Sequence, residues 1–425
     1  MAIVADTPKA SFRLGMLIYD TRYRSITIQI VVLILFMLGV GWLLDNLFSN
    51  LAERGKTLSF SFLWNRAGYD ISQTLIPYTN DNTHFRAMLV GLANTFLVAI
   101  LGCVAATIIG VIIGVLRLSK NWLVSKLMTI YVEGLRNVPL LLWILVAFAI
   151  FTEITPAPNE FRVTEQMKAD GIEPAASMVL FDSVAITNRG TVIPAAAYSR
   201  SLGEVNIGFL PISLNTLAVL AAIVGGLLAY RGIRNRATAI QEATGVRPVT
   251  WWKSLLVVFA PVSLVLLALG FSLEVPVLAG FNFKGGIIVG NSLMALWLGL
   301  TLYTAAFIAE IVRAGILAIS NGQSEAAYAL GLRPGRTMSL VVLPQALRVI
   351  IPPLISQYLN LTKNSSLAIA VSYMDLRGTL GGITLNQTGR ELECMLLLML
   401  IYLVISLTIS SGMNVYNNSV RLKER

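Results

Sequence analysis

The stretch Asn321–Pro344 reads N-G-Q-S-E-A-A-Y-A-L-G-L-R-P-G-R-T-M-S-L-V-V-L-P and separates two long apolar runs. This polar segment, interrupted by Gly and Pro, predicts one short helix. Asn321 is a suitable N-cap, and Glu325 lies early enough to favour the positive end of the helix. Gly331, followed by a proline three residues later, is expected to end it.

Three alanines of this predicted helix leave a nearly bare surface that another backbone can approach closely: Ala326, Ala327 and Ala329. A membrane protein has little internal need for a polar helix between two spans. A partner that docks on one side of the membrane does need one. An ordinary helical connector is the alternative interpretation of the same pattern.

The rest of the chain has the composition of a polytopic membrane protein. Of its 425 residues, 56% are hydrophobic and 13% are charged, whereas ordinary soluble domains carry about 25% charged residues. The first apolar run lacks a small-residue cleavage site, so it predicts an uncleaved anchor. Runs long enough to span a bilayer predict eight spans: Ser25–Leu44, Met88–Leu116, Leu127–Phe151, Phe209–Tyr230, Ser254–Leu273, Ile288–Val312, Leu340–Ser372 and Cys394–Met413.

The distribution of charge predicts the orientation of these spans. With both termini in the cytoplasm, the cytoplasmic segments hold 18 Lys and Arg residues and 5 acidic residues. The outer segments hold 11 Lys and Arg residues and 15 acidic residues. Lys and Arg are enriched in cytoplasmic loops of membrane proteins. The stretch Asn321–Pro344 is therefore expected in the cytoplasm, together with any partner that docks on it.

Two of the outer loops are long, Asp45–Ala87 and Thr152–Gly208. Their length allows a small structured cap, but loosely ordered linkers fit the sequence equally well. The sequence carries few groups suited to catalysis or metal binding, since it has no phosphate-binding loop and only one His and two Cys. We expect no metal site, no catalytic centre, no cofactor and no nucleic-acid partner.

Charged and polar residues inside membrane spans are costly and often functional. Glu133 and Arg136 lie three residues apart, as do Glu310 and Arg313, each pair at the inner end of a predicted span. Such spacing places both members on one helix face, where they can neutralise each other. A role in gating or in partner contact is the alternative.

The seventh span is broken by polar residues. Two prolines, Pro352 and Pro353, precede the consecutive residues Lys363, Asn364, Ser365 and Ser366. Four consecutive polar residues cannot all lie on one side of a helix, so the helix either breaks here or borders a water-filled space. A polar structural hinge is the alternative. Asn94 and Thr95, near the outer end of the second span, add an amide and a hydroxyl that commonly serve helix packing.

These residues resemble the permease subunits of bacterial ABC importers, whose cytoplasmic loop carries the sequence E-A-A followed by a glycine. Narrower similarity to the polar amino acid permeases lies in five blocks in family order: Gly91-Leu-Ala-Asn-Thr, Tyr131-Val-Glu-Gly-Leu-Arg-Asn-Val-Pro-Leu-Leu, Ala309-Glu-Ile-Val-Arg-Ala-Gly, Leu343-Pro-Gln-Ala-Leu-Arg with Pro352-Pro, and Leu361-Thr-Lys-Asn-Ser-Ser-Leu. The family's Gly-Thr-Pro is replaced by Asn137-Val-Pro, and an acidic residue that often follows the lysine is replaced by Asn364.

The resemblance implies an all-α polytopic fold of about eight transmembrane helices, with a five-helix type I-like core. One span would precede this core and a two-span segment would be inserted into it, as in the long permeases of general L-amino acid transporters. The implied divisions are 1–87, with the cytoplasmic N-terminus, first span and first outer loop; 88–152, the first part of the core; 153–287, the insertion; and 288–425, the second part of the core with the coupling loop.

The resemblance also implies partners and site residues. The chain would be a non-catalytic permease of the bacterial inner membrane, surrounded by lipid. Its partners would be a cytoplasmic ABC ATPase homodimer, which binds ATP and Mg, a second and different permease, and a periplasmic amino-acid-binding protein. The coupling residues would be Gly322, Glu325, Ala326, Ala327, Gly331 and Pro344. The broken seventh span would face the substrate path, where Lys363 is a candidate ligand for the amino acid carboxylate. The candidate residues of this path would be Asn94, Thr95, Lys363, Asn364, Ser365 and Ser366.

Two other functions remain open from the residues alone. An ion-coupled secondary transporter of small polar solutes would work without an ATPase, although the scarcity of acidic residues inside the predicted spans counts against it. A membrane scaffold would use the polar helix to recruit a cytoplasmic partner and would move no substrate.

Overall fold

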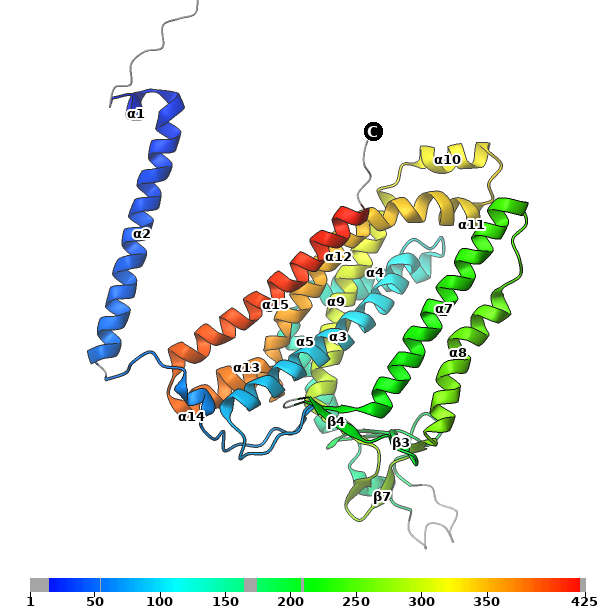
Figure 1. Ribbon diagram of the computed structural model, residues 1–425, viewed down its shortest axis with the longest axis horizontal. Helices are drawn as coiled ribbons and strands as arrows, with labels where there is room; N and C mark the ends of the chain where they lie inside the picture. Colours follow the sequence, from blue (N-terminus) through cyan, green and yellow to red (C-terminus); the bar gives the residue numbers. More distant parts are fainter. Residues whose placement is uncertain (1–14, 54, 164–173, 208–209, 421–425) are drawn as a thin grey trace, which may run out of the picture. The chain divides into compact units, whose positions relative to one another are not determined.

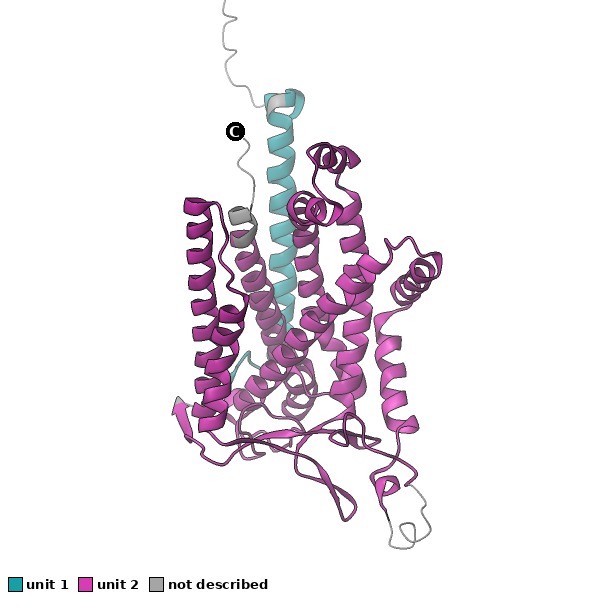
Figure 2. Ribbon diagram, turned by 90° about the vertical axis from the view of Figure 1, so that its right-hand side faces the viewer, with its two compact units in different colours: residues 1–61 teal, residues 62–425 magenta. Residues whose placement is uncertain are grey.

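The computed structural model describes residues 15–53, 55–163, 174–207 and 210–420. The chain divides into two compact units, residues 1–61 and 62–425 (Figure 2). The first unit holds α1 (Met16–Tyr19) and the long apolar helix α2 (Thr21–Glu53). No residue of the apolar part of α2 is buried, as expected of a helix whose solvent is lipid.

The second unit is built mainly from helices. They are α3 (His84–Leu116), α4 (Trp122–Asn137), α5 (Leu140–Ala149), α7 (Leu214–Thr244), α8 (Trp251–Ala268), α9 (Asn291–Leu317), α10 (Asn321–Ala329), α11 (Pro334–Thr337), α12 (Leu343–Asn364), α13 (Leu376–Gly378), α14 (Leu385–Thr388) and α15 (Glu391–Val420). Short 3-10 and π segments join them: η1 (Ser61–Trp64), η2 (Ile150–Ile154), η3 (Pro158–Phe161), η4 (Met338–Val342), η5 (Ser365–Val371) and η6 (Thr379–Thr384).

Seven helical stretches of the described chain are long and apolar enough to cross a membrane, or eight if one bent pair of helices counts as a span. The bent pair corrects one prediction, because Leu127–Phe151 is not a single continuous span. The helices α4 and α5–η2 meet at 104°. Proline disfavours helical geometry in the residue before it, and Val138, which precedes Pro139, is extended at φ −109° and ψ 136°.

The prolines of the later spans do not end their helices. Pro261 lies inside α8, and Pro352 and Pro353 lie inside α12. The break in the seventh span comes after the two prolines, where α12 changes at Ser365 into the 3-10 helix η5. That segment ends at Ser372, which has left-handed geometry (φ 57°).

The described strands all fall between Ala185 and Val289, so the described residues 185–207 of the predicted outer loop include strands rather than forming only a loose linker. They are β1 (Ala185–Thr187), β2 (Gly190–Ile193), β3 (Ala195–Tyr198), β4 (Glu204–Ile207), β5 (Leu210–Ser213), β6 (Phe271–Glu274), β7 (Val277–Ala279), β8 (Asn282–Lys284) and β9 (Ile287–Val289). Strand β2 pairs with β9, and β3 with β6, both antiparallel. The α7–α8 hairpin lies between the paired strands in the sequence, so these pairings hold the two ends of the hairpin together.

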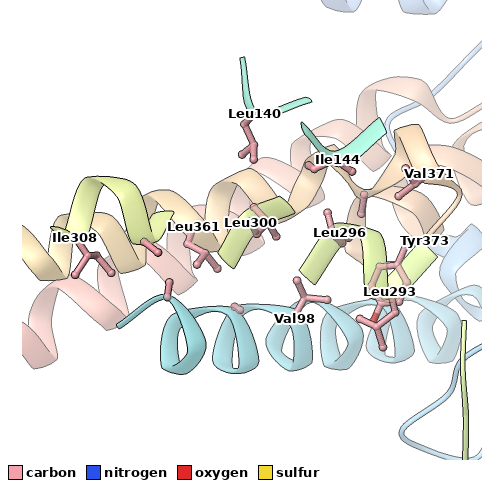
Figure 3. Close-up of a cluster of buried hydrophobic side chains, with 14 of the residues drawn as sticks. Val98, Leu140, Ile144, Leu293, Leu296, Leu300, Ile308, Leu361, Val371 and Tyr373 are labelled. Atoms are coloured by element: carbon pink, nitrogen blue, oxygen red, sulfur yellow. The ribbon is translucent and has the colours of Figure 1, made fainter. Parts of the chain in front are cut away.

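Helix α9 is the centre of the second unit. It contacts α3, α4, α5 and α12, and the side chains of Leu296, Leu300 and Ile308 are fully buried among them (Figure 3). Close approach to α3 depends on glycine, because a Cβ atom on Gly110 would lie 2.7 Å from the Cβ of Ile308. Small residues at such contacts allow helices to pack closely where lipid removes the hydrophobic driving force.

Candidate functional site

The short polar helix predicted from the sequence is α10, which lies at the end of the second unit opposite the strands (Figure 1). It begins at Asn321, so the N-cap is Ser320 and not Asn321 as expected, and the Ser320 side chain makes no capping bond. The chain turns away from the helix at Gly331, whose φ of +77° is readily available only to glycine. The N–H of Gly331 donates to the carbonyl of Tyr328 over 2.8 Å.

The side chains of α10 divide between an outer and an inner face. Gly322, Glu325 and Ala326 are exposed, whereas Ala327 is 4% exposed. Ala327 therefore holds the helix against the segment that follows, and α10 contacts η4. A bond of 3.4 Å from Gln345 Nε2 to Gln323 Oε1 also ties α10 to the first turns of α12. The outer face is free to accept another surface.

A continuous helical path leads from this region toward the middle of the unit. Helix α11 and the π segment η4 run directly into α12, which has Pro344 in its first turn. Proline is favourable there because the first N–H groups of a helix have no internal partner. Pro344 is exposed. A displacement of α10 would therefore act on α12 through the packed contacts of Ala327 and Gln345.

The predicted charge pairs form a network between helices. Arg313 Nη2 lies 2.6 Å from Glu310 Oε1 within α9, and Arg117, just after α3, also binds Glu310. Arg136 reaches Glu310 at 4.0 Å, and Glu133 reaches Arg117 at 3.9 Å. In the described chain no ion pair joins Glu133 to Arg136, because α4 packs on α9 and each of the two finds its partner on another element.

The polar residues of the seventh span differ in exposure. Lys363 is exposed, Asn364 and Ser366 are partly exposed, and Ser365 is fully buried. Both serines donate to backbone carbonyls one helical turn back, Ser365 to Thr362 and Ser366 to Lys363, each over 2.8 Å. The serine hydroxyls thus satisfy the backbone where the helix changes type, while the Lys363 ammonium remains available to a ligand.

Asn94 and Thr95 are buried at the contact between α3 and the segment before α13. Both N–H bonds of the Asn94 amide go to backbone carbonyls, to Gln73 over 2.9 Å and to Met374 over 2.8 Å. Since both partners are acceptors, they fix the orientation of the amide. The Thr95 hydroxyl donates to Gly91 and accepts from the Leu376 N–H over 3.0 Å.

Asn94 also lines a largely apolar cavity of about 580 Å³ between α3, α9 and strands β2 and β9. Three buried polar atoms on its lining residues have no partner in the structure: Asn94 Oδ1, Thr191 Oγ1 and Trp297 Nε1. The lining has no charged side chain. This cavity suits an uncharged group that both donates and accepts hydrogen bonds.

Sequence reasoning missed a buried carboxyl group, Asp375, which is fully buried between the seventh and last spans. Its Oδ1 accepts from the Gly378 N–H over 2.8 Å, and Tyr402 of α15 donates to its Oδ2 over 3.4 Å. Burial raises the pKa of Asp375 to about 7, against the opposing effect of the Gly378 and Arg377 N–H groups. Asp is a favoured N-cap residue, and Asp375 caps α13, but nothing in the local sequence indicates its burial.

Thr95 and Ser365 are both buried, whereas Lys363 is exposed. Thr95 lies beside Asp375 in the fold, because its hydroxyl accepts the N–H of Leu376, the residue that follows Asp375.

Comparison with known proteins gives consistent relatives. Residues 246–422 match the sequence family described as "Binding-protein-dependent transport system inner membrane component". The glutamate/glutamine/aspartate/asparagine transport system permease protein BztB of Rhodobacter capsulatus is 68% identical over 426 residues, covering 100% of both chains. The general L-amino acid transport system permease protein AapQ of Rhizobium johnstonii is 43% identical over 98% of this chain and 96% of its own. The putative amino-acid ABC transporter permease protein YhdX of Escherichia coli is 42% identical over 95% of each.

Proposed function

Because the chain belongs to the family of binding-protein-dependent transport system inner membrane components, we propose that it is the permease subunit of an ATP-driven importer of L-amino acids. It is a multi-pass protein of the inner membrane. The relatives named above are amino-acid transport permeases, one for four acidic and amide amino acids and one for general L-amino acids. Broad specificity for L-amino acids is the corresponding proposal for this chain.

The observation that carries the proposal is the division of α10 into two faces. Glu325 and Ala326 are exposed, and the buried Ala327 fastens the helix to the segment that leads into α12. A cytoplasmic ATPase that seats on the exposed face can thus transmit its closure to the seventh span. Glu325 supplies a charge-assisted anchor, Gly322 and Gly331 leave the ends of the helix uncovered, and Pro344 begins the helix that receives the motion.

The remaining subunits follow from this arrangement. In our proposal an ATPase homodimer binds ATP and Mg, and this chain performs no catalysis and needs no cofactor. A second permease, a different chain, completes the path, and a periplasmic binding protein delivers the amino acid. Both termini and α10 are cytoplasmic, since that orientation places 18 Lys and Arg residues inside and 11 outside.

The substrate path in this proposal runs beside the seventh span. Lys363 is exposed where the helix changes type, and its ammonium can pair with a carboxylate of the amino acid. Asn364 and Ser366 offer uncharged groups beside it. Thr95 and Ser365 are buried and support the path from behind, and Asn94 lines a cavity without charged side chains.

Charge reversal on the exposed face of α10 tests the coupling. Glu325→Lys should reduce amino acid uptake at least tenfold and reduce copurification of the ATPase, because it places a cation where a carboxylate anchors the partner. Glu242→Lys is the matched control: it makes the same charge change on an exposed residue of α7 and should leave uptake and copurification unchanged.

Two outcomes would overturn the proposal. Undiminished uptake and unchanged ATPase copurification in Glu325→Lys would remove α10 as the coupling helix. Amino acid transport by the purified chain alone, driven by an ion gradient without ATP, would favour a secondary transporter instead.

A further inference from the structure

The inserted hairpin α7–α8 has a surface that the proposed transport function does not use. In α7 the buried residues are Asn215, Gly226 and Ala237, and in α8 none is buried. The two helices pack on each other closely at Gly226, where a Cβ atom would lie 2.9 Å from the carbonyl oxygen of Val257. Many of their other apolar side chains are exposed, as in helices surrounded by lipid.

A groove of about 560 Å³ runs between the two helices at the end away from the strands. We call it the hairpin groove; it is lined by Leu227, Tyr230, Thr250, Trp251, Ser254, Leu255, Val258 and Phe259. Residues 251, 254, 255 and 258 follow the helical spacing of one face of α8. The walls are mostly apolar, so the groove can hold a hydrocarbon chain.

Cations adjoin the groove-lining residues Tyr230 and Thr250 in the sequence. Arg231 and Arg234 lie four and seven residues after Leu227, on the same face of α7. Arg236, Arg247 and Lys253 follow, and residues 231–253 contain a single acidic residue, Glu242. All five cations are exposed, and within the described residues none of them forms an ion pair with a carboxylate.

The height of these cations matches the level of lipid headgroups. The apolar part of α7, from Leu214 to Tyr230, is about 25 Å long at 1.5 Å per residue, close to the thickness of the hydrocarbon core. Arg231 therefore begins the polar zone. Trp251 and Trp252 are exposed at the same level, where aromatic residues are enriched in membrane proteins, and Lys253 lies 5.3 Å above the Trp252 ring.

The N-terminus of α8 adds positive potential at the same place. Its N-cap, Thr250, makes no side-chain capping bond, and Thr250 lines the groove. The first N–H groups of a helix have no internal partner and favour an anion. Arginines, free helical N–H groups and an apolar groove thus converge on one kind of ligand, a phosphate attached to a hydrocarbon chain.

We propose that the hairpin groove binds an anionic phospholipid. The phosphate lies among Arg231, Arg234, Arg247 and the first turn of α8, and one acyl chain occupies the groove. The excess of cations over carboxylates selects an anionic headgroup over a zwitterionic one, since basic residues at the membrane surface attract anionic lipids. The bound lipid would anchor the inserted hairpin in the leaflet on the same side of the membrane as α10.

Native mass spectrometry of the intact complex purified from the membrane tests this site. The probes are dioleoyl phosphatidylglycerol and dioleoyl phosphatidylcholine, added separately after delipidation. The unmodified complex should retain phosphatidylglycerol at least tenfold more tightly than phosphatidylcholine. The variant Arg231→Gln, Arg234→Gln, Arg247→Gln should lose that preference, and all three side chains are exposed, so folding should persist.

Two further variants sharpen the result. Arg189→Gln, Arg200→Gln, Lys284→Gln removes three exposed cations at the strand end and should keep the preference. Ser254→Phe fills the groove without changing its charge and should weaken retention of phosphatidylglycerol, with size-exclusion chromatography verifying assembly.

Equal retention of the two lipids by the unmodified complex would overturn the proposal, as would an unchanged preference in the arginine variant. Loss of a partner subunit from the arginine variant, with lipid retention unchanged, would show that an acidic protein surface covers the cations instead. None of these readouts depends on amino acid transport, so the lipid site and the proposed function can fail separately.

Discussion

The guanidinium of Arg117, at the end of α3, binds the carboxylate of Glu310 on α9, 193 residues further along the chain. Arg313 binds the same carboxylate at 2.6 Å, and Arg136 approaches it at 4.0 Å. One carboxylate thus joins three guanidinium groups from three helical segments. The Arg117 side chain is only 9% exposed, so carboxylates rather than water compensate its positive charge.

Removing this carboxylate should destabilise the packing of α3 and α4 on α9. Glu310→Gln leaves Arg117, Arg136 and Arg313 with Glu133 as their nearest remaining acid, and we expect a loss of about 2–3 kcal/mol. Thermal unfolding of the purified protein measures it. The control is Arg66→Gln, which breaks an exposed pair with Asp81 and should cost less than about 1 kcal/mol. Equal effects of the two variants would contradict a structural role for Glu310.

Asp375 should make stability depend on pH. Its pKa in the folded protein is about 7, above the unfolded value of about 4, so the folded protein holds this proton more tightly. Below about pH 4 both states are protonated and no penalty exists. Stability falls as the pH rises from about 4 to about 7, by about 4 kcal/mol in total, and then stays level.

Asp375→Asn should remove this component of the pH dependence. The amide keeps an oxygen for the Gly378 N–H and an N–H for the Tyr402 hydroxyl, but it cannot ionise. We expect its melting temperature to exceed that of the unmodified protein at pH 8, and the difference to shrink as the pH falls toward about 4. An identical pH profile for both proteins would show that the Asp375 carboxyl does not titrate in this range.

Two glycines in helices make a matched test of close packing. A Cβ atom at Gly110 would lie 2.7 Å from Ile308 and 2.9 Å from the carbonyl oxygen of Ala305. Gly110→Ala should therefore force α3 from α9 and cost about 1–3 kcal/mol. Gly134 of α4 has no atom within 4 Å of its Cβ position, so Gly134→Ala should stabilise by up to about 1 kcal/mol. Both are measured by thermal unfolding, and destabilisation by Gly134→Ala would contradict this account.

Cysteine labelling tests the substrate path. In the assembled transporter, Lys363→Cys should react with a maleimide, and substrate-loaded binding protein with ATP should slow the reaction at least threefold. Lys126→Cys, exposed on α4, should react at the same rate with or without substrate. The background from Cys103 and Cys394 is measured in the unmodified protein. Equal labelling of Lys363→Cys under both conditions would remove it from the path and favour a scaffold without transport.

Much of the chain could be predicted because its signals are local. A membrane span needs only a long apolar run, so the number of spans followed from the sequence. The glycine exit of α10 at Gly331 was also predictable, since its left-handed φ of +77° favours glycine. The break between α4 and α5 had a local signal too, in Val138 before Pro139.

The partners of the polar residues could not be predicted in this way. The spacing of Glu133 and Arg136 allowed a pair within one helix, yet the packing of α4 on α9 gives each a partner elsewhere. Likewise, the sequence around Asp375 describes a turn with a helix cap. Its complete burial depends on α15 and α3, which supply Tyr402 and the packing at Gly91.

The sequence by itself determined that this protein spans a membrane, which family it resembles, and where a polar helix is available for docking. Only the tertiary structure decided that Ala327 faces inward while Ala326 faces outward, that Ser365 is buried while Lys363 is exposed, and which acids and bases pair. The reason is physical. Transfer into lipid depends on the composition of each run alone, whereas burial and ion pairing depend on groups that distant parts of the chain bring together.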